Sequence, residues 1–321
     1  MKQTSLLALV FLSGSIAFAA DPQLLNMAPP DAKMYAGINV DQAKTSQFVQ
    51  FLLTNVPVNK DFQQFIDKTG FDPRRDLREV LIVTSGLAPA AGTQVSTTDG
   101  LFMAKGTFNI PQAIAAAGTD AQASVSTYAG AQVVTVGDGD HKATLAFIDG
   151  STAVAGDITS VKAALDRSKQ TNAIDPAIMA RINDLSTTED VWSISTAGFS
   201  SLPMFNGQNS NGQSGGVSAV LATIQQASCG VKFGTQVQVN AQAIAKDAGD
   251  ATALSDVIKM LASMVQMGSG TKDGPPAELI ALLKGLVVST DGSAVNVSLS
   301  IPEDQLESLV KLAHGEAAAK I

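Results

Sequence analysis

Short stretches in which hydrophobic and polar residues alternate recur along the chain, and each runs through a polar residue into an amphipathic stretch. This is the pattern of a strand followed by a helix. We expect residues 34–40 to form a strand, Asp41 to cap the next helix, and residues 42–53 to form that helix. Further strands of the same kind are expected at residues 101–108, 152–156, 191–195 and 295–299. Gly- and Asp-rich turns between consecutive strands favour antiparallel hairpins, so the predicted fold class is α+β.

Two distant segments resemble each other. Residues 77–86 (LREVLIVTSG) are similar to residues 283–292 (LKGLVVSTDG), and the strand after each ends in Asn-Ile-Pro-Gln or Ser-Ile-Pro-Glu. We interpret this as an internal duplication that gives two similar lobes, each a mainly antiparallel sheet with helices on one face. The first lobe is predicted to cover residues 20–185 and the second residues 186–321.

The N-terminus has the pattern of a secretory signal peptide. Lys2 precedes an apolar stretch at residues 6–18, and Ala17-Phe18-Ala19 is a small-x-small cleavage motif. We therefore expect residues 1–19 to be removed before Ala20, and the mature protein to be periplasmic or extracellular. After that cleavage the sequence predicts no transmembrane segment, because no apolar run reaches 18 residues.

Composition narrows the possible partners and chemistry. The 321 residues are 45% hydrophobic and 16% charged, which is typical of a folded chain, and the formal net charge is −8. An acidic chain without a Lys/Arg-rich run is a poor match for nucleic acid or anionic lipid surfaces. The single cysteine, Cys229, rules out an internal disulfide, and its sequence context favours a small buried residue.

Candidate chemistry is sparse, and the sequence predicts no cofactor and no metal site. The one local group of possible metal ligands, Asp138, Asp140 and His141, has a composition that a turn between strands also favours. A hydrolase would need His141 or His314 beside a serine, an aspartate or Cys229. With only two histidines in the chain, we favour a protein that is not an enzyme.

Two segments are candidate contact surfaces. Residues 72–79 gather Arg74, Arg75 and Arg78 beside carboxylates, which suits recognition of a carboxylate, a phosphate or a partner protein. The alternative, which we favour, is a solvated turn whose charges neutralise one another.

The helix predicted at residues 251–267 is the second segment. Met260 and Met264 broaden its apolar side, and methionine-rich faces adapt to apolar ligands or partner helices. The alternative, again favoured, is burial against the sheet of the second lobe.

The segment that contains Pro29-Pro30-Asp31-Ala32 and Asn39-Val40-Asp41, together with residues 69–77, resembles a family of uncharacterised exported bacterial proteins. Those proteins begin with two prolines, Asp-Ala, a strand, Asn-x-Asp and a helix. The resemblance implies export and an α+β repeat, and it implies no activity and no functional residue.

The leading functional hypothesis is a non-catalytic exported protein with a binding or scaffolding role in the bacterial envelope. The second is a carrier or chaperone for an apolar ligand or an envelope protein, which a continuous apolar pocket lined by Met260 and Met264 would favour. The third is a hydrolase. The expected partner is another envelope protein or an apolar small molecule.

Overall fold

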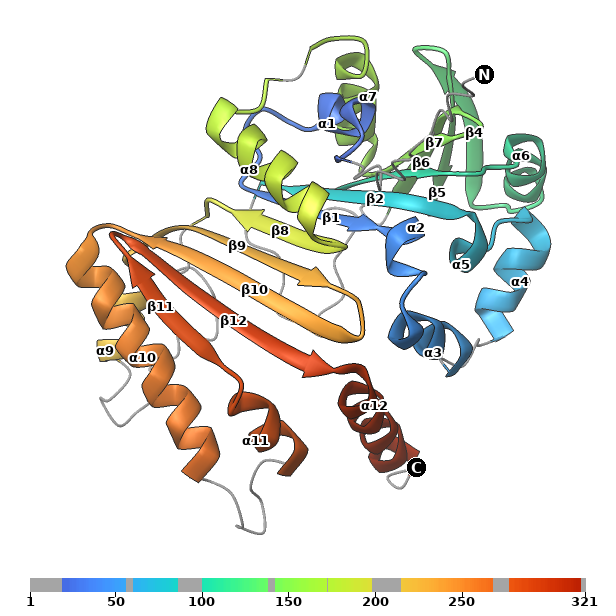
Figure 1. Ribbon diagram of the computed structural model, residues 1–321. Coiled ribbons are helices and arrows are strands. Elements are labelled where there is room, and N and C mark those ends of the chain that lie inside the picture. The colour runs from blue at the N-terminus through green and yellow to red at the C-terminus, as the bar shows by residue number, and fades with distance from the viewer. Residues whose placement is uncertain are drawn as a thin grey trace, which may run out of the picture.

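The structure is a computed structural model that describes residues 19–55, 60–85, 100–137, 142–171, 173–197, 215–267 and 277–318 (Figure 1). Its strands are β1 (Met34–Asn39), β2 (Leu77–Thr84), β3 (Leu101–Gly106), β4 (Ala123–Tyr128), β5 (Ala131–Val136), β6 (Ala143–Asp149), β7 (Thr152–Gly156), β8 (Val191–Ser195), β9 (Ile224–Lys232), β10 (Gln236–Ala245), β11 (Val287–Asp291) and β12 (Ala294–Pro302). They form one sheet in the order β11-β12-β10-β9-β8-β1-β2-β3-β7-β6-β5-β4. Helices accompany this large antiparallel sheet, which confirms the α+β class.

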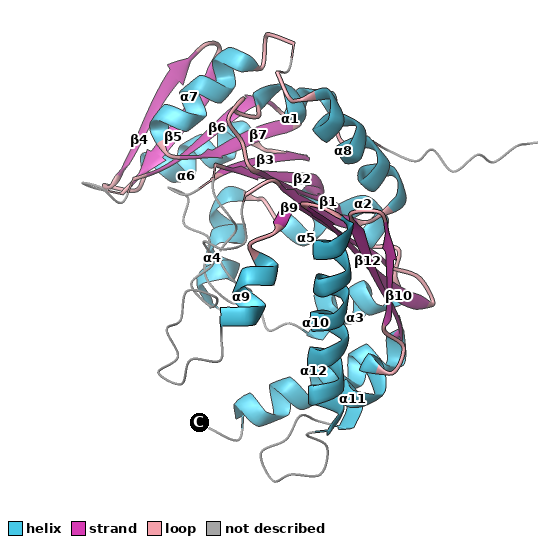
Figure 2. Ribbon diagram, turned by 90° about the vertical axis from the view of Figure 1, so that its left-hand side faces the viewer, coloured by secondary structure: helices cyan, strands magenta, loops and turns pink. Residues whose placement is uncertain are grey.

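The helices of the first half lie on both faces of the sheet (Figures 1 and 2). The helices on one face are α1 (Pro22–Met27), α7 (Ile158–Arg167) and α8 (Pro176–Thr188). The other face carries α4 (Lys60–Thr69) and α6 (Ile110–Gly118), and the short α2 (Val40–Ala43), α3 (Gln47–Asn55) and α5 (Pro73–Asp76) lie near it. This arrangement differs from the expectation that helices would cover one face only.

The main hydrophobic core lies between the sheet and α1, α7 and α8. Alternate strand residues point to the same face, so Leu81, Met103 and Val154 enter this core together, and each is at most 1% exposed. Arg167 ties α7 to the end of α1, because its guanidinium donates to the Met27 carbonyl at 3.0 and 2.8 Å. This face is therefore closed by packing.

The second half has a smaller core on β9, β10 and β12. Its helices are α9 (Gly215–Leu221), α10 (Ala248–Met267), α11 (Ala277–Leu283) and α12 (Glu303–Ala318). Leu254 of α10 and Val295 of β12 are the centre of this core, at 2% and 0% exposure. The C-terminal α12 instead contacts α3, where Lys311 lies over the ring of Phe51 at 4.9 Å and Glu303 accepts from the Ser46 hydroxyl at 2.7 Å.

The two halves share one sheet through β1 and β8. β1 pairs with β2 on one side and with β8 on the other, and β8 pairs in turn with β9. Gly37 of β1 is opposite Trp192 of β8, and a Cβ atom at Gly37 would overlap the indole ring. Trp192 and Ile194 belong to the main core although they follow the boundary predicted at residues 185/186. That boundary falls inside α8.

Candidate ligand cavity

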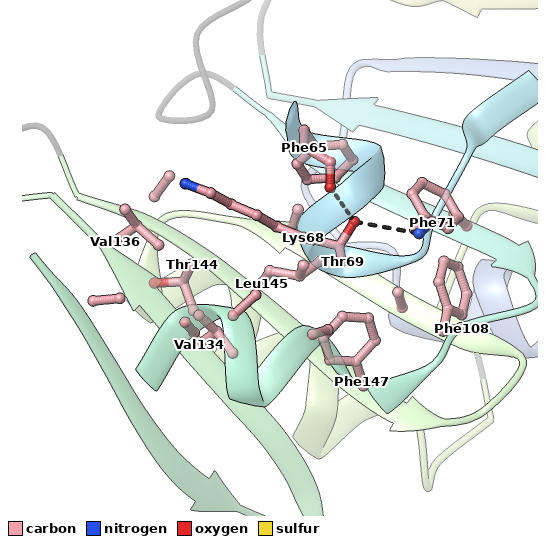
Figure 3. Close-up of a pocket in the computed structure, with 18 of the residues that line it drawn as sticks. Phe65, Lys68, Thr69, Phe71, Phe108, Val134, Val136, Thr144, Leu145 and Phe147 are labelled. Carbon is pink, nitrogen blue, oxygen red and sulfur yellow. Dashed lines mark hydrogen bonds between the residues drawn. The ribbon is translucent and has the colours of Figure 1, made fainter. Parts of the chain in front are cut away.

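A cavity of about 770 Å³ lies between the sheet and the two helices α4 and α6 (Figure 3). Its floor is the face of the sheet that the main core does not use. Residues directly opposite each other across the strands form the floor, since Phe102 pairs with Ala155, Ala155 with Leu145, and Leu145 with Val134. A neighbouring row joins Ala104, Ala153 and Phe147. Both rows are apolar, so they offer dispersion contacts. Thr144 of β6 also lines the cavity, and its hydroxyl is hydrogen-bonded to that of Thr135 at 3.2 Å.

Small side chains leave this space empty. Ala113, Ala116 and Ala117 of α6 line the cavity opposite Ala104, Ala153 and Ala155 of the sheet. An alanine side chain is too short to cross the gap between a helix and a sheet, so facing alanines leave a void that larger residues would fill. Although six of the nine residues of α6 are apolar, none of its residues is buried. The lack of burial follows from this void beneath the helix.

A row of aromatic rings closes one end of the cavity. Phe71 stacks on Phe108 at 5.3 Å between ring centroids, Phe108 lies 5.7 Å from Phe147, and Phe65 meets Phe71 edge-on at 6.3 Å. These rings come from α4, the segment after it, the segment between β3 and α6, and β6. The aromatic row therefore connects both covering helices to the sheet.

The C-terminus of α4 is fixed against the N-terminus of α6. Gly70, which follows α4, has a φ of +69°, and a Cβ there would lie 2.5 Å from Gln112 Oε1 of α6. The Gln112 amide also donates to the Lys68 carbonyl at 3.4 Å. The positive φ is what favours glycine at position 70, since the flexible end of the Gln112 side chain could move away from a Cβ atom.

Most polar groups that line the cavity are engaged within the protein. Asn109 caps α6 by accepting from the Gln112 amide at 3.2 Å, and Asp120 accepts from the Gln122 amide at 2.9 Å. The Thr69 hydroxyl donates to the Phe65 carbonyl at 2.7 Å. These groups cap helices and turns, so they are not free to change the apolar character of the cavity.

Lys68 differs from these groups. Its side chain is exposed, extends from α4 towards Val136, and lies at the edge of the cavity (Figure 3). Within the described part of the chain, no hydrogen bond or ion pair involves its ammonium group. A cation with no partner among the described residues therefore lies at the edge of the cavity.

Arg74 and Arg75 do not line the cavity but form the turn beside it. Arg74 makes two hydrogen bonds to Asp72, at 2.9 and 2.8 Å, and Arg75 makes two to Asp76, both at 2.7 Å. The hydrogen bonds from the arginines hold the pKa of Asp72 and of Asp76 below its usual value. The Asp76 carboxylate also accepts from the Asp72 amide at 2.8 Å. Both guanidinium groups are therefore used to hold the turn that directs Phe71 into the aromatic row.

Arg78 lies elsewhere, exposed at the rim of a second, polar cavity of about 530 Å³ that Glu79 and Lys105 also line. The three arginines of the candidate surface are thus not brought together in one recognition site.

Met260 and Met264 are 46% and 56% exposed on the outer side of α10 and do not line the apolar cavity. Leu254 and Ile258 of the same helix pack on the second core. We expected the methionines either to be buried against the sheet or to line an apolar pocket. Neither expectation matches their position in the structure. The helix turns the side that carries Leu254 and Ile258 to the sheet, which leaves Met260 and Met264 exposed.

The remaining candidate residues form no site in the described part of the chain. Cys229 in β9 is partly buried, and burial raises the pKa of its thiol. Asp138, Asp140 and His141 lie outside the described residues, as does the side chain of His314. Among the described residues, no three His, Cys, Asp or Glu side chains gather as a metal site would require, and no helix combines the length and apolarity needed to span a bilayer.

Sequence reasoning did not find the apolar cavity. Its lining comes from six strands and two helices, and no local motif marks it. The one signal in the sequence was the Ala-rich, otherwise apolar segment at residues 110–118, whose lack of large side chains is unusual for a helix that covers a sheet.

No protein-family model matches the chain, and no curated protein matches it. Among solved structures, crystal forms III and IV of a protein designated TP0453 align over 91% and 92% of this chain and 98% and 97% of theirs. The identities are 10% and 11% and the TM-scores 0.48 and 0.49. A likeness at this level carries no weight for fold or function.

Proposed function

We propose that the protein is a non-catalytic binding protein that holds a long apolar molecule with an anionic end, such as a fatty acid, in the cavity beneath α4 and α6. The observation that carries this proposal is the cavity itself, about 770 Å³ in volume with an apolar floor and an alanine-rich roof. Sites for small molecules are usually about 300–1,000 Å³ with mostly apolar walls. Of the functions expected from the sequence, the carrier for an apolar ligand is the one that this cavity favours.

Lys68 supports the anionic end of the ligand. An ammonium group at the edge of an apolar cavity can pair with a carboxylate while the attached chain leaves water. Each buried methylene group contributes about 0.8 kcal/mol to the binding of the chain, so affinity comes mainly from the apolar part and orientation from Lys68.

The expected signal peptide bears on where the protein would act. The signal-peptide pattern of residues 1–19 supports a periplasmic or extracellular carrier, and such a carrier would exchange its ligand with another envelope component. No reaction is part of the proposal, because Thr69, Asn109 and Asp120 in the cavity serve turns and helix ends.

The order of elements supports the proposed internal duplication into two lobes. Residues 77–86 contain β2, which is followed by β3 and α6, and residues 283–292 contain β11, which is followed by β12 and α12. In both cases two adjacent antiparallel strands lead into a helix. The proposed lobes would thus share a strand–strand–helix unit joined into one sheet.

Titration of the purified mature protein with palmitate and with hexadecanol tests the proposal, with native mass spectrometry to count bound molecules. We expect one palmitate per chain with a Kd of about 10 μM or lower. Lys68→Met should weaken palmitate binding about tenfold and leave hexadecanol binding unchanged. If neither compound binds, the carrier function is wrong, and if Lys68→Met affects both equally, the pairing with an anionic end is wrong.

A further inference from the structure

The polar cavity of about 530 Å³ surrounds the residues that follow the expected cleavage site. It lies where the start of α1 meets β1, β2, β3 and α8, and it is lined by Ala19, Ala20 and Asp21 on one side. Its charged or titratable side chains are Asp21, Asp41, Arg78, Glu79 and Lys105. This cavity is separate from the proposed ligand site, and unlike that site it is lined by several charged side chains.

Ala20 is held inside the protein, although it follows the residue at which the leader is expected to end. Its exposure is 4%, whereas Ala19 is exposed. The Ala20 backbone nitrogen donates to the Ser186 hydroxyl of α8 at 3.0 Å, and Ser186 is itself 4% exposed. The next nitrogen along the chain, that of Asp21, donates to Glu79 Oε1 at 3.0 Å. Two successive backbone nitrogens thus point at polar groups of the folded domain.

Among the described residues, no cation forms an ion pair with Glu79. The nearby Lys105 ammonium contacts the Asp21 carboxylate at 3.4 Å and also donates to Gln23 at 2.5 Å and to Thr152 at 3.0 Å. While residue 19 remains attached, burial raises the pKa of Glu79 to about 7, and Lys105 opposes that shift only in part. A half-buried carboxyl group therefore faces the backbone of the expected new N-terminus without a direct ion pair.

We propose that cleavage before Ala20 creates an α-ammonium group that stays in this cavity, donating to Ser186 and pairing with the Glu79 carboxylate, so that maturation anchors the N-terminus. In the cleavage a leader peptidase adds water across the Ala19–Ala20 peptide bond. The leader leaves with the carboxylate of Ala19, and the amine of Ala20 takes a proton from solvent, since an α-amino group has a pKa of about 8. Because consecutive backbone nitrogens lie within about 4 Å of each other, the new cation reaches Glu79 with little movement.

The anchor has a physical consequence for Glu79. An ammonium group beside a carboxylate favours its charged form, so it offsets the desolvation that Glu79 experiences in the uncleaved chain. The mature protein therefore gains a charge pair that the precursor does not have, and the fold becomes more stable when the leader is lost.

A double-mutant cycle on the exported, processed protein tests this. The N-terminus is first sequenced, and then the free-amine form and an Nα-acetylated form are unfolded with urea at pH 7.5, each with Glu79 and with Glu79→Gln. Acetylation should raise the unfolding equilibrium constant about tenfold with Glu79, and about twofold or less with Glu79→Gln. Asp41→Asn, an exposed carboxylate of the same cavity, is the matched control and should leave the effect of acetylation unchanged.

The reactivity of the α-amine gives a second readout that needs no substitution. In the folded wild-type protein, acylation of the Ala20 amine at pH 7.5 should be at least about tenfold slower than in the urea-unfolded protein, because folding buries this nitrogen. An N-terminus at a different residue, equal acetylation effects with Glu79 and Glu79→Gln, or equal acylation rates in folded and unfolded protein would each overturn the proposal. None of these results depends on fatty-acid binding.

Discussion

The ring of Phe71 lies against the ring of Phe108 at 5.3 Å with an interplanar angle of 29°. Phe71 follows α4 and Phe108 precedes α6, so this contact joins the two helices that cover the apolar cavity. A stacked aromatic pair contributes about 0.5–1.5 kcal/mol beyond the area it buries. The geometry of the cavity therefore depends on a contact at its closed end, away from the edge where Lys68 lies.

Filling the cavity from its roof should remove the ligand without harming the fold. Ala117→Leu adds three carbon atoms on the cavity side of α6, and we expect palmitate affinity to fall about tenfold or more as the chain loses room. Leucine is a good helix former, so the free energy of unfolding should stay within about 1 kcal/mol of the wild type. Fluorescence titration and urea unfolding measure the two effects.

Ala115→Leu is the control for that experiment. Ala115 is on the same helix, is exposed and does not line the cavity. It should leave the affinity unchanged. Equal losses of affinity in the two variants would contradict the assignment of the ligand to this cavity.

Gly37→Ala should destabilise the joint between the two halves of the sheet. A Cβ at this position would overlap Trp192, which is 3% exposed and cannot move without disturbing the core. We expect a loss of about 2–4 kcal/mol in the free energy of unfolding, measured by urea denaturation. Gly118→Ala, at the end of α6 with no atom within 4 Å, should be neutral or slightly stabilising. If the two variants were equally stable, the close packing of Trp192 against Gly37 would not be what holds the two halves of the sheet together.

The turn that contains Asp72 and Asp76 should make stability fall in acid. The pKa of each carboxyl is lowered in the folded state by hydrogen bonds from Arg74 and Arg75. Such groups contribute stability above their unfolded pKa of about 3.9 and lose it as the pH falls through the lower folded value. Asp76→Asn should therefore be less stable than wild type at pH 7, and the gap should narrow below about pH 4.

Urea unfolding at pH 7, 5 and 3 measures this trend. Asp184→Asn, which disrupts an exposed pair with Arg181, should change stability less at every pH. A gap for Asp76→Asn that stays constant from pH 7 to pH 3 would rule out the carboxylate as its source.

The two sides of α10 should respond differently to substitution. Leu254→Ala removes a side chain that is 2% exposed in the second core, and we expect a loss of about 2–5 kcal/mol. Met264→Gln changes a side chain that is 56% exposed and should stay within about 0.5 kcal/mol of wild type. Thermal unfolding of both variants measures the difference, and a large loss with Met264→Gln would show that its side chain is covered in solution.

The individual elements could be predicted because their signals are local. The strands expected at residues 152–156 and 191–195 have those bounds in the structure. The helix expected at residues 42–53 is instead two helices, α2 and α3, separated by residues 44–46.

The arrangement of the elements could not be predicted, because the deciding contacts are remote in sequence. The pairing of β1 with β8 joins residues more than 150 positions apart, so the alternation of apolar residues in each strand does not reveal it. The cavity escaped prediction for the same reason, because alanines at positions 104, 116 and 153 mean little until the fold places them opposite one another.

Because β1 lies between β2 and β8, its two edges are paired in a fixed order as the chain is synthesised from the N-terminal end. β2 follows within 50 residues, but the other edge of β1 has to wait for β8, more than 100 residues after β2. An unpaired strand edge is a site for wrong pairing with other chains, and distant partners slow folding. Aggregation during synthesis should therefore be most acute after β1 and β2 have formed and before Trp192 arrives to cover Gly37.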